Sequence, residues 1–330
     1  MSETTQRVLV TGATGMIGRI LCEQLADAGY VVRAALRTDV AMPGCVVEKV
    51  VTGEITGVSD WTRALDRVNC VVHAAARTHV LHDTPSNTEL YFETNARGTQ
   101  RLAQMAAQAG VRRFIYLSSV KVNGENSGAN SFGSKDPPDP RDVYGRSKLA
   151  GERALFEIAA RHEMEAAVVR PPLVYGPGVR ANFLRLMRWV DAEWPLPLGS
   201  IRNRRSLVSV WNLTDLLLTL LRHPAAPGRV WMVSDGMDLS TPQLIERLAT
   251  ALQRRCRLVP VPAGALRVLA SVVGRRAEFA RLCGSLTVDV AETRQLLTWS
   301  APVRVDDALA RTAAWYRLER RPVSTGAPPT

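Results

Sequence analysis

The chain has 330 residues, of which 46% are hydrophobic, and 42 Lys and Arg against 31 Asp and Glu give a formal net charge of +11. This size suits one large or two modest domains, while a polar N-terminus and the lack of any apolar run of about 18 residues argue against a signal peptide and a spanning helix. We therefore expect a cytoplasmic protein, and five cysteines, odd in number and without CxxC spacing, argue against a disulfide framework and a metal site.

The first half alternates short β-branched apolar runs with helical patterns, which is typical of βαβ units in a doubly wound parallel sheet. Strands are predicted at residues 7–11, 31–36, 46–51, 70–74, 114–118 and 167–170, and helices at 16–28, 86–108 and 143–161. Residues 123–141 are rich in Gly, Asn, Ser and Pro, so they predict a long surface loop directly before a helix.

Helical patterns dominate the second half. Helices are predicted at residues 182–192, 210–222, 241–253, 264–274, 289–297 and 305–317, with one short strand at 230–233. Residues 321–330 combine Pro, Ser, Thr and Gly without apolar periodicity, which predicts a disordered tail.

A glycine-rich loop joins the first predicted strand to the first predicted helix. The stretch Gly12-Ala13-Thr14-Gly15-Met16-Ile17-Gly18 follows the strand at once. Glycines at such a place permit a tight turn, let backbone N–H groups approach a pyrophosphate and allow close packing of helix on sheet. A purely structural turn is the alternative, but the position between strand and helix favours a dinucleotide site.

The end of the second predicted strand distinguishes between dinucleotides. An acidic residue there binds the ribose 2′-hydroxyl of NAD, whereas a basic residue accommodates the 2′-phosphate of NADP. Leu36 stands where the acid would fall, so Arg37, with Arg33 as a helper, favours NADP(H). Two solvated arginines are the alternative, and the nearby Asp39 leaves NAD(H) open.

Tyr144 and Lys148 are four residues apart, so a helix places both on one face. A phenol with its ordinary pKa of about 10 is a poor acid or base at neutral pH, and an ammonium one turn away lowers that pKa. Ser118 and Ser119 end the preceding strand, and either can hydrogen-bond an oxygen whose charge changes during hydride transfer. A half-buried tyrosine beside a solvated lysine is the alternative.

Taken together, these motifs resemble the extended short-chain dehydrogenases/reductases of the nucleotide-sugar epimerase/dehydratase family, over about residues 7–320. The glycine spacing GxxGxxG is the family's own, and further similar stretches are residues 53–56, 71–76, 95–99 and 170–178. The resemblance implies that Ser119, Tyr144 and Lys148 are the catalytic residues. It also implies that Lys148 binds the nicotinamide ribose.

The resemblance also implies which residues contact the cofactor and the substrate. Arginine suits the diphosphate of a UDP-sugar because its planar fork gives paired, charged hydrogen bonds. The expected cofactor contacts are Gly12, Thr14, Gly15, Met16, Ile17, Gly18, Arg33, Arg37, Glu54, Ile55, Ala74, Ala75, Ala76, Asn95, Tyr144, Lys148, Pro171 and Val174. The expected substrate contacts are Ser118, Ser119, Lys121, Asn182, Arg205 and Arg281.

One stretch departs from the epimerases that this chain resembles. Their catalytic serine is usually followed by Val-Tyr-Gly, whereas Ser119 is followed by Val-Lys-Val-Asn-Gly. Together with Arg37 and residues 170–178, this stretch looks most like bacterial reductases of 4-keto-6-deoxy-N-acetylhexosamines from O-antigen synthesis. We therefore expect NADPH-dependent 4-reduction of a UDP-linked sugar. A UDP-hexose 4-epimerase with tightly held NAD and a non-catalytic NADP-binding scaffold are the alternatives.

The resemblance divides the chain into an NADP-binding Rossmann domain and a smaller, mostly helical substrate domain. The first is expected at residues 1–175 with a return segment near 206–235, and the second at 176–205 and 236–320. A homodimer through residues 86–108 and 143–161 is an expectation at the level of the family.

The basic excess is uneven. Residues 1–170 carry a net charge of +1, and residues 171–330 one of +10. Compositional drift towards arginine explains this excess as well as an anionic ligand or membrane surface does, and the dispersed arginines carry no nucleic-acid motif. The predicted helix at 264–274 is apolar apart from Arg267, so it predicts either a core helix or peripheral contact with an anionic membrane. Such contact would suit an enzyme whose sugar is attached to a polyprenyl diphosphate.

Overall fold

A seven-stranded parallel sheet dominates the computed structural model, which describes residues 6–78, 85–272, 274, 279 and 282–320. The predicted strands are confirmed, each with its ends shifted by at most two residues. Their order is β3-β2-β1-β4-β5-β6-β9, so the doubly wound α/β prediction is confirmed as well. The bounds are β1 (Arg7–Thr11), β2 (Val31–Leu36), β3 (Glu48–Val51), β4 (Cys70–His73), β5 (Arg113–Leu117), β6 (Glu165–Arg170) and β9 (Arg229–Met232).

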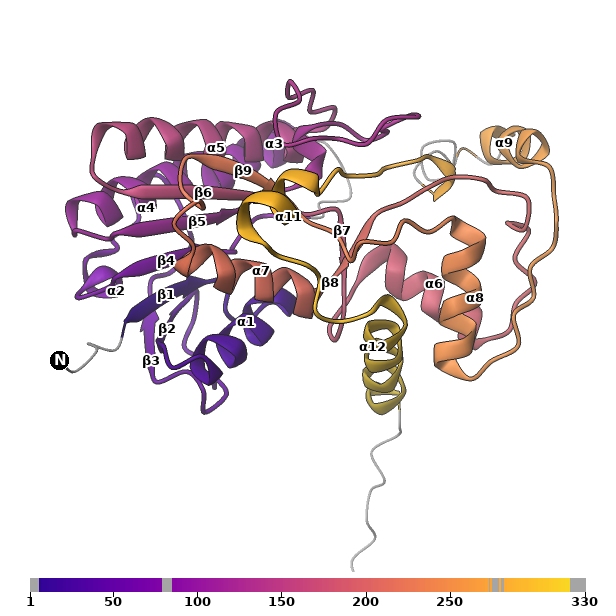
Figure 1. Cartoon of the computed structure of the whole chain (residues 1–330), viewed down its shortest axis with the longest axis horizontal. Helices are drawn as coiled ribbons and strands as arrows, with labels where there is room; N and C mark the ends of the chain where they lie inside the picture. The colour runs from indigo at the N-terminus through magenta and orange to yellow at the C-terminus, as the bar shows by residue number, and fades with distance from the viewer. Residues whose placement is uncertain (1–5, 79–84, 273, 275–278, 280–281, 321–330) are drawn as a thin grey trace, which may run out of the picture.

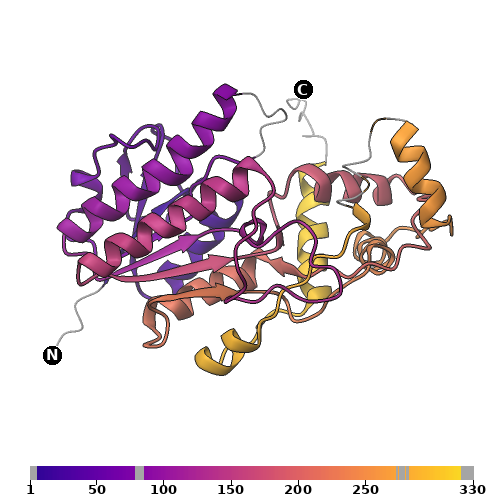
Figure 2. The same cartoon turned by 90° about the horizontal axis from the view of Figure 1, so that it is seen from above.

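Helices cover both faces of this sheet (Figures 1 and 2). Because neighbouring residues of a strand face opposite sides, Val8 and Val10 pack into one core and Leu9 into another. The helices α1 (Met16–Asp27) and α7 (Val210–Arg222) complete the first core. The second face is covered by α2 (Thr62–Leu65), α4 (Gly98–Gln108) and α5 (Val143–Arg161).

The helix predicted at residues 86–108 is not one regular helix. It consists of α3 (Pro85–Phe92), a π-helical turn η1 (Glu93–Arg97) and α4. A π-helical turn inserts one extra residue and often lies at a functional site. Here the turn carries Asn95, whose buried side chain has partners outside its own helix.

A third core lies beyond the sheet and is built from three amphipathic helices. These are α6 (Ala181–Asp191), α8 (Thr241–Leu252) and α12 (Val305–Glu319). A short parallel pair that the sequence pattern did not predict, β7 (Leu173–Tyr175) with β8 (Leu207–Ser209), connects this core to the sheet. Leu297 and Trp299, which end and follow α11 (Ala291–Leu297), pack into the sheet's core instead.

The predicted loop at residues 123–141 contains neither helix nor strand and follows the short 3₁₀ turn η2 (Val120–Val122). Helix α9 (Ala263–Val272) covers most of the helix predicted at 264–274. Within the described ranges, no helix has both the length and the apolar character to cross a membrane. The predicted tail at 321–330 lies outside them.

Candidate active site

The loop between β1 and α1 leaves room at the N-terminus of α1. Gly12 has a φ of +72°, and a Cβ there would lie 2.8 Å from the backbone nitrogen of Ala75. A Cβ on Gly18 would lie 2.1 Å from the Gly12 carbonyl oxygen, so the helix approaches the strand closely. Since no side chain caps α1 at Gly15, its first N–H groups can bind a pyrophosphate.

A chain of hydrogen bonds through His73 fixes the turn that follows β4. The Thr99 hydroxyl donates to a backbone carbonyl and therefore accepts from Nε2–H of His73, 3.0 Å away. Nδ1 then accepts from the Thr11 hydroxyl at 2.7 Å, and Thr11 accepts from the backbone N–H of Ala75 at 3.2 Å. The imidazole is thus neutral and holds the turn against Gly12.

We expect His73 to make the protein less stable in acid. Burial, together with a smaller contribution from the charge of Lys148, lowers the pKa of His73 from 6.5 to about 3. The unfolded chain then binds the proton more readily, so the stability from neutral His73 is full above pH 6.5 and is lost as pH falls toward 3. This loss is about 2 kcal/mol between pH 7 and pH 5.

Urea unfolding of wild type and His73→Gln at both pH values measures this loss. Gln cannot titrate in this range, so the variant's free energy of unfolding should fall by about 2 kcal/mol less than that of wild type. Equal losses in the two proteins would show that His73 titrates normally.

The structure brings the predicted catalytic residues together. Asp142 caps α5 by accepting from the backbone N–H of Gly145 at 2.7 Å, which places Tyr144 and Lys148 one turn apart on this helix. A side-chain hydrogen bond joins Ser119 and Tyr144. The Lys148 side chain is fully buried, and its Nζ lies 4.0 Å from the ring centroid of Tyr116.

The pKa values of these residues differ from the expectation. Burial raises the pKa of Tyr144 above its usual range, Asp142 raises it further and the hydrogen bond with Ser119 opposes the rise. Burial also lowers the pKa of Lys148 to about 7, although Glu152 opposes that shift. The expected lowering of the Tyr144 pKa is therefore not found, because burial raises this pKa more than the hydrogen bond with Ser119 lowers it.

Lys148 also indicates what the site binds. Within the described part of the chain, Nζ of Lys148 has no hydrogen-bond partner, which is costly for a buried amine. Two hydroxyls of a ribose would supply the missing acceptors, and the uncapped N-terminus of α1 would hold the phosphates of the same molecule. The residues present thus fit a dinucleotide cofactor.

A buried ion pair that sequence reasoning missed lies beneath the catalytic residues. Nε and Nη2 of Arg170 donate to the two carboxylate oxygens of Glu152 at 3.0 and 2.6 Å, and Nη1 donates to Asn123 at 3.1 Å. Both charged side chains are at most 4% exposed. Ser118 is buried and donates to Glu152, so the prediction that Ser118 binds substrate is corrected. Glu152 follows Lys148 by four residues, a signal that the sequence offers.

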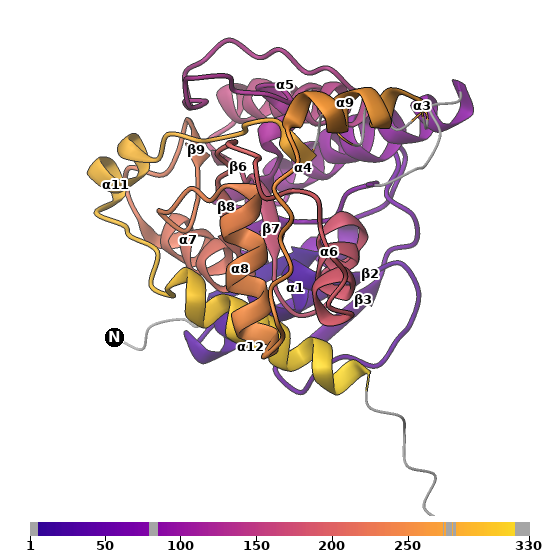
Figure 3. The same cartoon turned by 90° about the vertical axis from the view of Figure 1, so that its right-hand side faces the viewer.

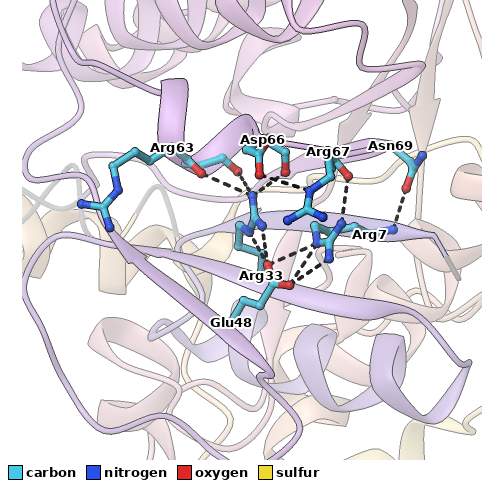
Figure 4. Close-up of polar contacts among 8 residues, drawn as sticks. Arg7, Arg33, Glu48, Arg63, Asp66, Arg67 and Asn69 are labelled. Carbon is cyan, nitrogen blue, oxygen red and sulfur yellow. Dashed lines mark hydrogen bonds and ion pairs between the residues drawn. The ribbon is translucent and has the colours of Figure 1, made fainter.

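Arg33 is not a cofactor ligand, and this prediction is wrong. Its guanidinium is buried and bonded to Glu48 at 2.5 Å and to the backbone carbonyls of Ala64 and Asp66 at 3.1 and 2.7 Å (Figure 4). Arg7 shares Glu48 from β1. Arg33 faces α2 because side chains alternate along β2, and its place in the middle of the strand keeps it away from the carboxyl end.

Arg37 follows β2 and stays at the edge where a cofactor would lie. Its side chain is 72% exposed, and Nη1 lies 3.4 Å from a carboxylate oxygen of Glu54, itself 70% exposed. These two predicted cofactor contacts therefore form a pair, and a phosphate beside Arg37 would also meet the negative charge of Glu54.

Other predicted residues have protein partners. Asn95 bonds to the backbone of Arg77 and to the Ser147 hydroxyl, so it joins the segment after β4 to α5 and its assignment as a cofactor ligand is corrected. Lys121, predicted to bind substrate, pairs with Glu125 at 3.1 Å and with Asp142.

The structure describes two of the three substrate contacts predicted in the second half, Asn182 and Arg205. Asn182 is exposed at the start of α6 and accepts from Arg185 at 2.7 Å. Arg205 precedes β8, is partly buried and donates to the Gly284 carbonyl at 3.1 Å. Arg281 lies outside the described residues.

Segments that carry the remaining predicted cofactor contacts meet at the same edge of the sheet. A Cβ on Gly178, which follows β7, would lie 3.7 Å from the Met16 side chain. The contacts of the remaining predicted residues with a cofactor stay predictions. These residues are Thr14 and Ile17 near the start of α1, Ile55 after β3, Ala74 and Ala76 after β4, Pro171 after β6 and Val174 in β7.

Comparisons with known proteins agree with this site. Residues 8–234 match the NAD dependent epimerase/dehydratase family. The chain is 40% identical over 310 residues to a Vibrio cholerae UDP-glucose 4-epimerase, covering 93% of this chain and 94% of that protein. It is 26% identical over 319 residues to the N-acetyl-α-D-glucosaminyl-diphospho-ditrans,octacis-undecaprenol 4-epimerase of Escherichia coli O157:H7, covering 92% and 93%.

A solved structure resembles the whole chain. MoeE5 in complex with UDP-glucose and NAD superposes with a TM-score of 0.76 at 27% identity, covering 95% of this chain and 99% of that one. The sheet, the third core and the segments between them therefore share one arrangement with MoeE5.

Proposed function

Because the chain belongs to the NAD dependent epimerase/dehydratase family, we propose that it inverts carbon 4 of a hexose carried on a diphosphate, as a 4-epimerase that keeps its NAD. The 40% identity to a UDP-glucose 4-epimerase, which extends over nearly the whole chain, carries this proposal. The site supports it because Ser119, Tyr144 and the unpartnered Lys148 lie together at the end of the sheet.

The residues of the site would divide the proton chemistry among them. Tyr144 would take the proton of the sugar 4-hydroxyl and later return it, while Ser119 would hold the same oxygen. When bound, NAD supplies the chemistry of accepting a hydride from carbon 4 and returning it to the other face. Hydrogen-bond acceptors around Nζ would restore the charge of Lys148, and that charge would favour the Tyr144 phenolate.

A 4-reductase that uses NADPH is the second candidate, and Arg37 is the observation that favours it. A 2′-phosphate beside Arg37 gains a charge-assisted hydrogen bond. Glu54, at 3.4 Å from that guanidinium, opposes the same phosphate, since both carry negative charge. This opposition and the similarity to the Vibrio cholerae UDP-glucose 4-epimerase favour the epimerase over the reductase.

Cofactor retention and substrate turnover test the two candidates. We expect protein purified without added cofactor to release NAD when denatured, and to convert UDP-glucose to UDP-galactose unaided. A polyprenyl-diphosphate-linked N-acetylglucosamine, tested beside it, identifies the carrier of the sugar. Consumption of NADPH with a UDP-4-keto-6-deoxy-N-acetylhexosamine, together with no turnover in its absence, would instead establish the reductase.

Arg37→Ala is the accompanying variant. In an epimerase that keeps NAD, it should leave turnover nearly unchanged, because Arg37 is exposed and contacts no reacting atom. In a reductase, loss of the phosphate partner should raise KM for NADPH by roughly 10-fold or more while KM for NADH stays constant.

A further inference from the structure

Helix α9 presents an apolar stripe to solvent. Ala265, Val268 and Val272 recur at the spacing of one helix face, and Val268 and Val272 are 64% and 79% exposed. Leu266 is 9% exposed and packs into the third core. The helix is therefore held by one side and offers the other to a partner.

This stripe belongs to a larger surface at one end of the molecule. Figure 1 places α9 and the segment from α8 to α9, residues 253–262, at the end farthest from the sheet, and Figure 3 looks onto that end. The segment carries Arg254, Arg255, Arg257 and the exposed Val259.

An exposed tryptophan adjoins the segment. An isolated β-bridge between Leu196 and Leu258 joins the chain after α6 to the segment 253–262. The backbone N–H of Arg255 also lies 3.3 Å from a carboxylate oxygen of Glu193. The next residue, Trp194, is 61% exposed. Trp194, residues 253–262 and the exposed face of α9 are together called the end surface below.

The charge of the end surface is positive. Asp191 and Glu193 pair with Arg254 at 2.9 Å and with Arg257 at 3.8 Å. Arg255 and Arg267 are exposed and add positive charge beyond these pairs. Valines and a tryptophan beside arginines are the composition of segments that lie in a membrane interface, where anionic headgroups attract the arginines and the apolar side chains insert.

We propose that the end surface docks onto an anionic lipid bilayer. Exposed apolar residues occur both on α9 and on the segment 253–262, which Figures 1 and 3 place at the same end of the molecule. Besides the buried side and the apolar stripe, α9 has a side that lines a cavity of about 440 Å³, where Gly264 and Arg267 lie together with Asn203. Docking through α9 would place the opening of this cavity close to the headgroups.

Cosedimentation of the whole protein with vesicles tests the proposal without reference to catalysis. We expect binding to vesicles of phosphatidylcholine mixed with phosphatidylglycerol at low salt. Binding should weaken at high salt and be absent with phosphatidylcholine alone, since it needs both charge and insertion. Absence of binding to the mixed vesicles at low salt, or equal binding to both kinds of vesicle, would overturn it.

Two variants locate the contact. Val268→Asp with Val272→Asp should weaken binding by roughly 10-fold or more, because it removes the inserted stripe and adds negative charge. Val58→Asp is the matched control: Val58 is 86% exposed and precedes α2 in the sheet part of the chain. All three side chains are exposed, so both variants should unfold at the wild-type temperature. Equal binding by the double variant and the control would place the contact elsewhere and refute the proposal.

Discussion

We expect the replacement of Tyr144 with Phe to lower kcat by about 100-fold or more and to leave binding of the dinucleotide nearly unchanged. The change removes one hydroxyl, which hydrogen-bonds Ser119, and keeps the ring that packs edge-on against Tyr91 at 6.2 Å between centroids. In the proposed reaction, transfer of the proton at the sugar oxygen would then have no group in place, while the uncapped N-terminus of α1 and the buried Nζ of Lys148 would still be available to the cofactor.

Tyr91→Phe is the matched control, since it removes a phenol hydroxyl from the neighbouring ring. We expect its kcat to stay within about threefold of wild type, because the variant keeps the ring that packs on Tyr144 and loses only the smallest contribution to the Tyr144 pKa. Single-turnover rates and cofactor titration measure both variants. If Tyr144→Phe kept its rate, another acid would perform the step; the loss of catalysis alone would exclude a non-catalytic scaffold.

Local patterns allowed the cofactor loop and the catalytic helix to be predicted from the sequence. The glycine spacing after β1 and the separation of Tyr144 from Lys148 are both fixed within one loop or one helical turn. To these the structure adds the burial that shifts their pKa values, the Asp142 cap on α5 and the hydrogen bond between Ser119 and Tyr144.

Predictions that depended on distant partners were less reliable. Arg33 was assigned to the cofactor because it stands near Arg37 in the sequence, but its partner Glu48 comes from the next strand and its carbonyl acceptors from α2. The role of Asn95 likewise depends on a π-helical turn and on Ser147, 52 residues away. Neither contact produces a periodic signal in the sequence.

Breaking the buried pair of Glu152 and Arg170 should cost more stability than breaking any exposed pair on the same helix. Glu152→Met leaves the guanidinium of Arg170, a residue only 3% exposed, charged and without its carboxylate partner. An unpaired buried charge of this kind destabilises a protein by about 3–5 kcal/mol. Ser118 loses its acceptor in the same variant. Glu157→Met is the matched control on α5, because Glu157 pairs with Arg161 in solvent and such pairs contribute about 1 kcal/mol or less.

The double variant Glu152→Met with Arg170→Met shows whether the charges or the packing cause this loss. With both charges absent, no buried ion is left unpaired, so we expect the double variant to be more stable than the sum of the two single losses implies. Urea unfolding of wild type, Glu152→Met, Arg170→Met and the double variant gives the coupling free energy of the pair. Strict additivity, or a Glu152→Met loss no larger than that of Glu157→Met, would mean that the pair is hydrated in solution and does not hold β5, β6 and α5 together beneath the catalytic residues.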